Sequence, residues 1–385
     1  MIDSDLMRSY YQYKKHQEVG HLKISFFKKI LLSLLFFMLI PSFIFKVFYL
    51  ICFKRDGSDK GLYIFPFTIY EPMKSIVAKL ESIENTTVVN FPKALPIFPT
   101  VLLKDFGNIL FKKPFWTLKN LDFFGALAFK ILPHYGYKMK YNISKLLLLQ
   151  EYSFYSSYLT HMYESENGSL YNIMHGIPGE EASFFRFTKC FVWGEYFKDF
   201  YIKNHAKESQ FVIAGSIYHK KLLDNYCLDK ENKVDILYAL QGDKFIDRKY
   251  TQDTYDALLK VQKEVGITIA VKPHPRFSNS DIIPKSFIKI DSSPIKSICD
   301  STLIISHFST ILLDAKVVGK NVLAFVPLGH HNLVNYLEFD EIVYDKDTLY
   351  ESIVNIFHQE KDINTFKSII NLQLDTKEII IDAIS

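Results

Sequence analysis

Residues 234–276, VDILYALQGDKFIDRKYTQDTYDALLKVQKEVGITIAVKPHPR, contain the pattern that decides the fold. The run VDILYALQG at 234–242 is short and apolar, which predicts a buried strand. Residues 251–265 have apolar side chains at helical spacing, and the apolar run that follows, GITIAVK, predicts a second strand. A strand, a helix and a strand of these lengths form a βαβ unit, so this part of the chain predicts a parallel sheet.

The alternation of strands and helices continues on both sides of this unit. Further strands are expected at 61–67, 86–91, 169–176, 189–194, 210–216, 286–291, 301–307 and 321–327. Helices are expected at 71–83, 294–300 and 309–319, and residues 98–148 look mostly helical. We therefore expect the α/β class, with two Rossmann-like domains that face a cleft.

A polar stretch, LDKENK at 228–233, separates the two series of strands. We place a domain boundary there. The expected organisation is a basic and apolar segment at 1–60, a first domain at 61–230, a second domain at 231–345 and C-terminal helices at 346–385.

The segment from Lys28 to Arg55 is apolar and is flanked by basic residues at both ends. Its uncharged part, 30–45, is shorter than the roughly 20 residues that a spanning helix needs. Three alternatives remain: a helix lying in the membrane surface, a spanning helix that includes Lys46, and a helix buried against the globular body. The first two would put the protein at the cytoplasmic face of the inner or plasma membrane, as a peripheral or monotopic protein.

The net charge of +4 is unevenly distributed along the 385 residues. Residues 1–60 hold ten Lys and Arg against five Asp and Glu, and residues 104–145 hold eight Lys against two Asp. Such stretches attract anionic surfaces or are ordinary solvated faces. The four cysteines have no CxxC or zinc spacing, which excludes a disulfide framework or a cysteine metal site and fits a reducing cytoplasm.

Polar residues cluster where three of the predicted strands end, which is where open α/β sheets bind ligands. The first cluster is Lys272, His274 and Arg276 in VKPHPR. Pro273 and Pro275 stiffen this loop, and its cationic and imidazole side chains can donate hydrogen bonds to a phosphate.

The second cluster lies in SHFSTILLDA at 306–315. Ser309 and Thr310 come where a strand ends and a helix begins, which is a favourable place for an anion. Asp314, one turn later, is placed to reach a ribose hydroxyl.

The third cluster lies in MHGIPGEE at 174–181, in the first domain. His175 follows a strand and is our candidate for the base that accepts a proton from an acceptor hydroxyl. Glu180 and Glu181 could orient this histidine or act as the base themselves.

Each of these residues also has a structural alternative. A strand-end histidine is often structural, and Ser309 or Thr310 can be a plain helix cap. Asp314 can be a solvated helix residue, and the two glutamates suit the first turn of a helix.

Two absent patterns narrow the chemistry. No DxD motif lies between the strands, so we expect no metal ion and no resident cofactor. Neither a Walker A loop nor GxGxxG is present, which argues against ATP hydrolysis and hydride transfer. No nucleic-acid-binding signature accompanies the basic stretches.

The order HG, KPHP, S-x-x-S-T and GKNVLAF within 169–327 resembles bacterial surface-polysaccharide glycosyltransferases of GT-B fold. It is most similar to the capsule and teichoic-acid group, which includes CDP-glycerol glycerophosphotransferases, polysialyltransferases and capsular Kdo transferases. The resemblance implies that His274, Ser309 and Thr310 bind the donor phosphate and that His175 is the general base.

The expected protein is therefore a metal-independent, membrane-associated glycosyltransferase. It would move a sugar from a nucleotide donor to a capsule or lipopolysaccharide-type glycan, free or lipid-linked. A CMP-sugar is the donor favoured by the resemblance. Three alternatives remain: transfer of a polyol phosphate from CDP-glycerol or CDP-ribitol, epimerisation of a nucleotide sugar, and a non-catalytic role in glycan assembly.

Overall fold

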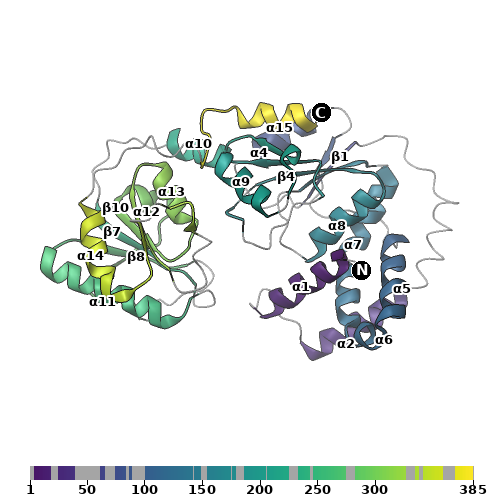
Figure 1. Cartoon of the computed structure of the whole chain (residues 1–385), viewed down its shortest axis with the longest axis horizontal. Helices are drawn as coiled ribbons and strands as arrows, with labels where there is room; N and C mark the ends of the chain where they lie inside the picture. Colours follow the sequence, from purple (N-terminus) through teal and green to yellow (C-terminus); the bar gives the residue numbers. More distant parts are fainter. Residues whose placement is uncertain are drawn as a thin grey trace.

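The computed structural model of the chain contains two parallel α/β sheets, each covered by helices (Figure 1). It describes residues 4–18, 25–39, 61–65, 74–83, 86–88, 100–141, 143–148, 154–174, 176–178, 186–204, 206–224, 233–242, 246–274, 282–326, 334–337, 341–358 and 369–384.

The first sheet belongs to the N-terminal domain and has the strand order β2-β1-β3-β4-β5-β6. All its neighbouring strands run parallel. Its strands are β1 (Leu62–Phe65), β2 (Thr86–Val88), β3 (Lys145–Leu148), β4 (Ser169–Ile173), β5 (Lys189–Val192) and β6 (Phe211–Ile213). Its helices include α4 (Lys74–Glu81), α5 (Thr100–Lys112), α6 (Pro114–Lys119), α7 (Leu121–Tyr141), α8 (Phe154–Ser165), α9 (Glu195–Lys203) and α10 (Ile217–Asp224), with the short 3-10 helix η2 (Glu208–Gln210).

The second sheet has the order β12-β11-β10-β7-β8-β9 and is also parallel throughout. Its strands are β7 (Val234–Ala239), β8 (Ile269–Lys272), β9 (Ile288–Lys289), β10 (Ser301–Ser306), β11 (Asn321–Phe325) and β12 (Ile342–Val343). Its helices are α11 (Arg248–Val265), α12 (Pro294–Cys299), α13 (Ile311–Val317) and α14 (Lys346–Phe357). The predicted α/β class with parallel sheets is confirmed.

One strand of the first sheet was not expected. Residues 98–148 were predicted to be mostly helical, yet the last four of them form β3, between β1 and β4. The run LLLL at 146–149 is apolar on both faces, as a central parallel strand requires, and periodicity cannot distinguish such a run from a buried helix.

The first helix, α1 (Ser4–Glu18), belongs to the body of the N-terminal domain. It packs against α8, and its Leu6 and Tyr13 are fully buried. The Tyr13 hydroxyl donates to Asp122 Oδ2 at 3.0 Å. The expectation of one membrane-associating segment at 1–60 is therefore wrong for α1, because this helix contributes to the core.

The second helix, α2 (Phe26–Leu39), covers the first part of the predicted apolar segment, and residues 40–60 lie outside the described residues. It packs closely on α7. A Cβ added at Gly125 of α7 would come within 2.0 Å of the Leu32 carbonyl oxygen, so only glycine allows this approach. Among the described residues, no helix combines the length and the apolar character needed to cross a bilayer.

The C-terminal helices do not form one unit. Helix α14 packs on β11 and α11 of the second domain, whereas α15 (Thr376–Ile384) packs on α4 of the first (Figure 1). The connecting chain crosses beside Gly215, which has φ +75°; a Cβ there would come within 2.3 Å of the Asn371 carbonyl oxygen. The Asn371 N–H donates to the Trp193 carbonyl at 2.8 Å, which ties the tail to the first domain.

Two buried histidines make the stability of the fold depend on pH. Burial lowers the pKa of both His134 and His307 to about 4. Between about pH 4 and the usual histidine pKa near 6.5, the unfolded chain therefore binds more protons than the native chain. We predict that the free energy of unfolding rises with pH across this window.

Urea unfolding at intervals from pH 5 to 7 measures that slope. The variant His307→Gln should show a shallower slope than the wild type, whatever its absolute stability. An equal slope in the two proteins would contradict the assignment of His307 as a group that stays neutral in the native state.

Candidate functional site

The strand order β10-β7-β8 brings the two predicted phosphate-binding loops to the same edge of the second sheet. Both β8 and β10 are parallel to β7, so their carboxyl ends face the same way. Since neighbouring strands lie about 4.8 Å apart, the loops after β8 and β10 begin about 10 Å from each other, on either side of the end of β7.

The loop after β8 begins with Lys272, Pro273 and His274, all of them half-buried. The Lys272 Nζ donates to the Ser292 carbonyl, which fixes the turn after β9 against this strand end. Burial lowers the pKa of Lys272, and the nearby Asp291 opposes that shift. Phosphate binding by Lys272 and His274 stays a prediction, and Arg276 lies outside the described residues.

The loop after β10 contains Ser309 and Thr310. Ser309 is half-buried, and its Oγ accepts from the Ile311 N–H at 3.4 Å. Thr310 is exposed at the start of α13 and makes no side-chain capping bond. The Thr310 hydroxyl is therefore not occupied by capping, and phosphate binding by both residues stays a prediction.

The neighbouring His307 is a core residue. It is fully buried, its Nδ1 donates to the Phe325 carbonyl at 2.7 Å, and its Nε2 accepts from the Tyr238 hydroxyl at 2.7 Å. These bonds span three strands of the sheet, so they hold the end of β10 beside β7 and β11.

Sequence reasoning missed Gln241, which follows β7 between the two loops. Its side-chain Oε1 is buried and has no hydrogen-bond partner in the part of the chain that the structure describes. A buried amide oxygen without a partner costs free energy, which a donor hydroxyl or N–H from a ligand would recover. The only sequence signal was its position at a strand end.

Asp314 lies at the contact between the two domains. Its Oδ2 accepts from the Tyr218 hydroxyl at 3.0 Å, and its Oδ1 accepts from His219 Nε2 at 3.1 Å. Asp314 is 9% exposed and His219 is 1% exposed. The ribose contact predicted for Asp314 stays a prediction. To bind a ribose hydroxyl, the carboxylate would have to give up its bond to Tyr218 or to His219.

A chain of contacts leads from Asp314 to the strand end that precedes His175. The His219 ring lies 4.7 Å from the Trp193 ring, and the Trp193 indole donates to the Met174 carbonyl at 3.1 Å. At the other end, the Asp314 N–H donates to the Thr310 carbonyl at 3.1 Å. Met174 is thus connected to Thr310 through the buried side chains of Trp193, His219 and Asp314 and one backbone hydrogen bond of α13.

His175 itself, Glu180 and Glu181 lie outside the described residues. Their predicted catalytic roles stay predictions. The described residues contain no group of three or more His, Cys, Asp or Glu side chains that could hold a metal ion.

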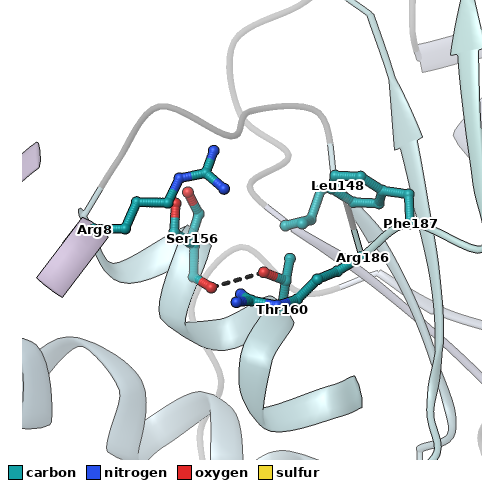
Figure 2. Close-up of a pocket in the computed structure, with 7 residues that line it drawn as sticks. Arg8, Leu148, Ser156, Thr160, Arg186 and Phe187 are labelled. Carbon is teal, nitrogen blue, oxygen red and sulfur yellow. Dashed lines mark hydrogen bonds between the residues drawn. The ribbon is translucent and has the colours of Figure 1, made fainter. Parts of the chain in front are cut away.

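The N-terminal domain has a small pocket that sequence reasoning also missed (Figure 2). Arg8 from α1 and Arg186 before β5 approach the face of α8 that carries the hydroxyls. The pocket is lined by Arg8, Leu148, Ser156, Ser157, Thr160, Arg186 and Phe187. Its cavity volume of about 20 Å³ is enough for one small polar group.

The pocket combines hydroxyl side chains of α8 with two arginines, one of which is in an ion pair. Arg186 Nε lies 3.0 Å from Glu164 Oε2, and the Thr160 hydroxyl donates to the Ser157 carbonyl at 2.7 Å. Two guanidinium groups beside serine and threonine hydroxyls form a donor-rich surface, which suits an oxygen of a carboxylate or a phosphate. The residues come from three distant parts of the chain, so no local motif could have revealed them.

Comparisons with known proteins give the fold class. No protein-family model and no curated protein matches the chain. Solved structures do match. A variant of the wall teichoic acid polymerase TagF has a TM-score of 0.51 at 13% identity, over 94% of this chain and 98% of that one.

Two further structures match comparably. UDP-GlcNAc 2-epimerase from Neisseria meningitidis, bound to UDP-GlcNAc, has a TM-score of 0.52 at 11% identity, over 84% of this chain and 98% of that one. The S. aureus MnaA–UDP structure has a TM-score of 0.52 at 12% identity, over 84% and 95%.

The chain therefore has the two-domain GT-B type of α/β fold, as the sequence predicted. Of these three structures, one is a teichoic acid polymerase, one is a UDP-GlcNAc 2-epimerase bound to UDP-GlcNAc, and one contains UDP.

The contact between the domains should contribute measurably to stability. We predict that His219→Ala lowers the free energy of unfolding by about 2 kcal/mol, because it leaves a largely buried carboxylate short of a donor, and that Tyr218→Phe lowers it by about 1 kcal/mol. Chemical denaturation measures both values.

The matched control is Tyr350→Phe, which removes a hydroxyl that donates to the exposed Glu264. Such a surface bond contributes close to nothing, so the control should unfold like the wild type. If Tyr218→Phe behaved like this control, Asp314 would not be a structural tie between the domains.

Proposed function

We propose that this protein is a membrane-associated, metal-independent glycosyltransferase of bacterial surface-glycan assembly. It transfers a sugar from a nucleotide donor to a capsule or lipopolysaccharide-type acceptor. The observation that carries the proposal is the contact chain from Met174 through the buried side chains of Trp193, His219 and Asp314 to the backbone of Thr310. It links the strand end before the proposed base to the proposed phosphate site.

On the donor side, the nucleotide phosphate binds across the end of β7. His274 and Arg276 donate from the β8 loop, and Ser309 and Thr310 donate from the β10 loop. Lys272 supports the site from a position where its ammonium already holds the Ser292 carbonyl. Gln241, between the loops, accepts a hydrogen bond from a sugar hydroxyl or a base N–H.

In the reaction, His175 takes the proton of the acceptor hydroxyl as the acceptor oxygen forms a bond to the anomeric carbon. The bond from that carbon to the phosphate oxygen breaks, and the nucleotide leaves with the electron pair. The donors around the phosphate stabilise the negative charge that develops there. No resident cofactor takes part in this scheme, and a CMP-sugar is the favoured donor.

On the acceptor side, the pocket between α1 and α8 binds one anionic group of the acceptor. Its two arginines suit a carboxylate or phosphate oxygen, and its volume of about 20 Å³ is enough for one small polar group. Arg8 and Arg186 would therefore set the affinity for the acceptor and leave the affinity for the donor nucleotide unchanged.

Two alternatives share the fold. Transfer of a polyol phosphate is favoured by the TagF likeness, which covers 94% of this chain. Epimerisation is favoured by the likeness to the UDP-GlcNAc 2-epimerases. An assay with CMP-sugars, CDP-polyols and UDP-sugars separates the three, because an epimerase converts its nucleotide sugar without an acceptor.

We predict that His274→Ala weakens nucleotide binding about tenfold or more, since a hydrogen bond to a charged phosphate is worth about 1.5–3 kcal/mol. Gln241→Leu should weaken binding of the complete donor. Isothermal titration with CMP, CDP and UDP measures the effect of His274→Ala, and titration with a complete nucleotide-sugar donor measures the effect of Gln241→Leu. His358→Ala is the matched control, because this exposed histidine lies at the C-terminal end of α14.

His175→Ala should bind nucleotide normally and lose turnover. If it turned over donor at the wild-type rate, the base assignment would be wrong. If His274→Ala bound nucleotide as tightly as His358→Ala does, the phosphate assignment would be wrong. A wild-type protein that converted no donor in any of the three groups would point to the non-catalytic role.

For the acceptor pocket, we predict that Arg8→Gln raises the KM for an anionic acceptor about tenfold or more at an unchanged nucleotide affinity. Arg8→Lys should recover part of the loss, because it restores the charge without the planar fork. An Arg8→Gln enzyme with wild-type acceptor KM would show that the acceptor binds elsewhere.

A further inference from the structure

The helices of the N-terminal domain carry large apolar side chains that face solvent. Phe27 of α2 is 78% exposed, Phe111 of α5 is 90% exposed and Phe115 of α6 is 86% exposed. The other members of this set, which we call the apolar face, are Phe26, Ile30, Leu31, Leu34 and Leu118. Monomeric soluble proteins rarely expose so many large apolar side chains together, and such patches mark interaction sites.

Packing on one helix brings these residues together. The Leu32 backbone of α2 lies against Gly125 of α7. The Trp116 ring of α6 lies 6.2 Å from the ring of Phe124, which precedes Gly125 in α7. Helices α5 and α6 are also in contact with each other. Figure 1 shows α2, α5 and α6 gathered at the end of the N-terminal domain farthest from α15.

The exposed charged side chains described beside the apolar face are positive. Lys28, Lys112, Lys113 and Lys119 are exposed beside it. The described residues of α2 and α6 include no acidic side chain, and Asp105, the single acid of α5, is 4% exposed and accepts from the Tyr158 hydroxyl. Apolar side chains bordered by lysines match a surface that is apolar inside and anionic outside.

We propose that the apolar face docks this protein on an anionic lipid bilayer, with α2, the end of α5 and α6 at the interface and their phenylalanines in the acyl boundary. Helices that bind in this way combine buried apolar area with attraction of lysines to anionic headgroups. A second copy of this chain is a less favourable partner, because a symmetric contact between two apolar faces would bring the same lysines together.

Docking would also hold the acceptor pocket at a fixed position relative to the bilayer. This inference rests on the proposed function. Helix α1, which carries Arg8, packs on the same layer: the Tyr10 ring lies 4.8 Å from the Trp116 ring, and the Tyr10 hydroxyl donates to Asn120. The pocket is thus rigidly connected to the bilayer-facing helices, and the acceptor that suits it is an anionic, lipid-linked glycan.

The test is flotation of the full chain with vesicles of phosphatidylcholine, with and without phosphatidylglycerol. We expect binding to the anionic vesicles that weakens with added salt. The double variant Phe111→Ser/Phe115→Ser should bind about tenfold more weakly, because the apolar part of the attraction is lost. Lys112→Gln/Lys113→Gln should weaken binding at low salt only.

The matched control is Ile288→Ser/Tyr344→Ser, which removes exposed apolar side chains from the second domain and should bind like the wild type. Since all these positions are exposed, unchanged circular dichroism checks that each variant folds. Unchanged nucleotide binding by Phe111→Ser/Phe115→Ser separates this proposal from the proposed function.

Three results would overturn the proposal. The first is equal vesicle binding by the wild type and the phenylalanine variant, as expected if residues 40–60 of this chain cover the face. The second is absence of binding to anionic vesicles. The third is a dimer in vesicle-free solution that the phenylalanine variant abolishes, which would make a second copy the occupant.

Discussion

The carboxylate of Asp314 ties the two domains together. Its two oxygens accept from two consecutive residues of α10, Tyr218 and His219, across the contact between the domains. A charged group at this depth is costly unless donors surround it. The pairing also orients the imidazole: in the tautomer whose Nε2 donates to Asp314, Nδ1 accepts from the Ser216 hydroxyl, 2.8 Å away.

Other parts of the structure depend on this contact. Trp193 packs on His219 and holds the Met174 carbonyl, while the chain after α14 crosses back and bonds the Trp193 carbonyl through Asn371. The end of β4 and the start of α13 are therefore held by the same buried cluster. Loops of both domains can then act on one substrate, which a transfer between two bound molecules requires.

Much of the fold could be predicted from the sequence, because buried parallel strands and amphipathic helices leave local patterns. The strands β7, β8, β10 and β11 fall where their apolar runs predicted them. Strand β3 could not be identified, because LLLL has no period that distinguishes a strand from a helix. The burial of α1 depends on partners more than a hundred residues away, such as Asp122 for Tyr13.

In the candidate site, too, residues in local sequence patterns could be predicted and contacts between distant residues could not. Ser309, Thr310 and His274 could be proposed as phosphate-binding residues because ligands bind at strand ends in open α/β sheets. The ribose contact of Asp314 stays a prediction, and its bonds to Tyr218 and His219 could not be predicted because those residues lie in the other domain. Gln241 has no local signature beyond its position at a strand end, and the pair Arg8 and Arg186 has none, since their surroundings are assembled by the sheet order and by helix packing.

A crystal structure of the full chain with bound CMP or UDP tests the central claim most directly. The account predicts the nucleotide phosphate at the end of β7, within hydrogen-bond distance of His274 and of Ser309 or Thr310, with the His175 side chain facing it from the first domain. A nucleotide bound away from both loops, or a His175 that faces away from the bound nucleotide, would contradict the account.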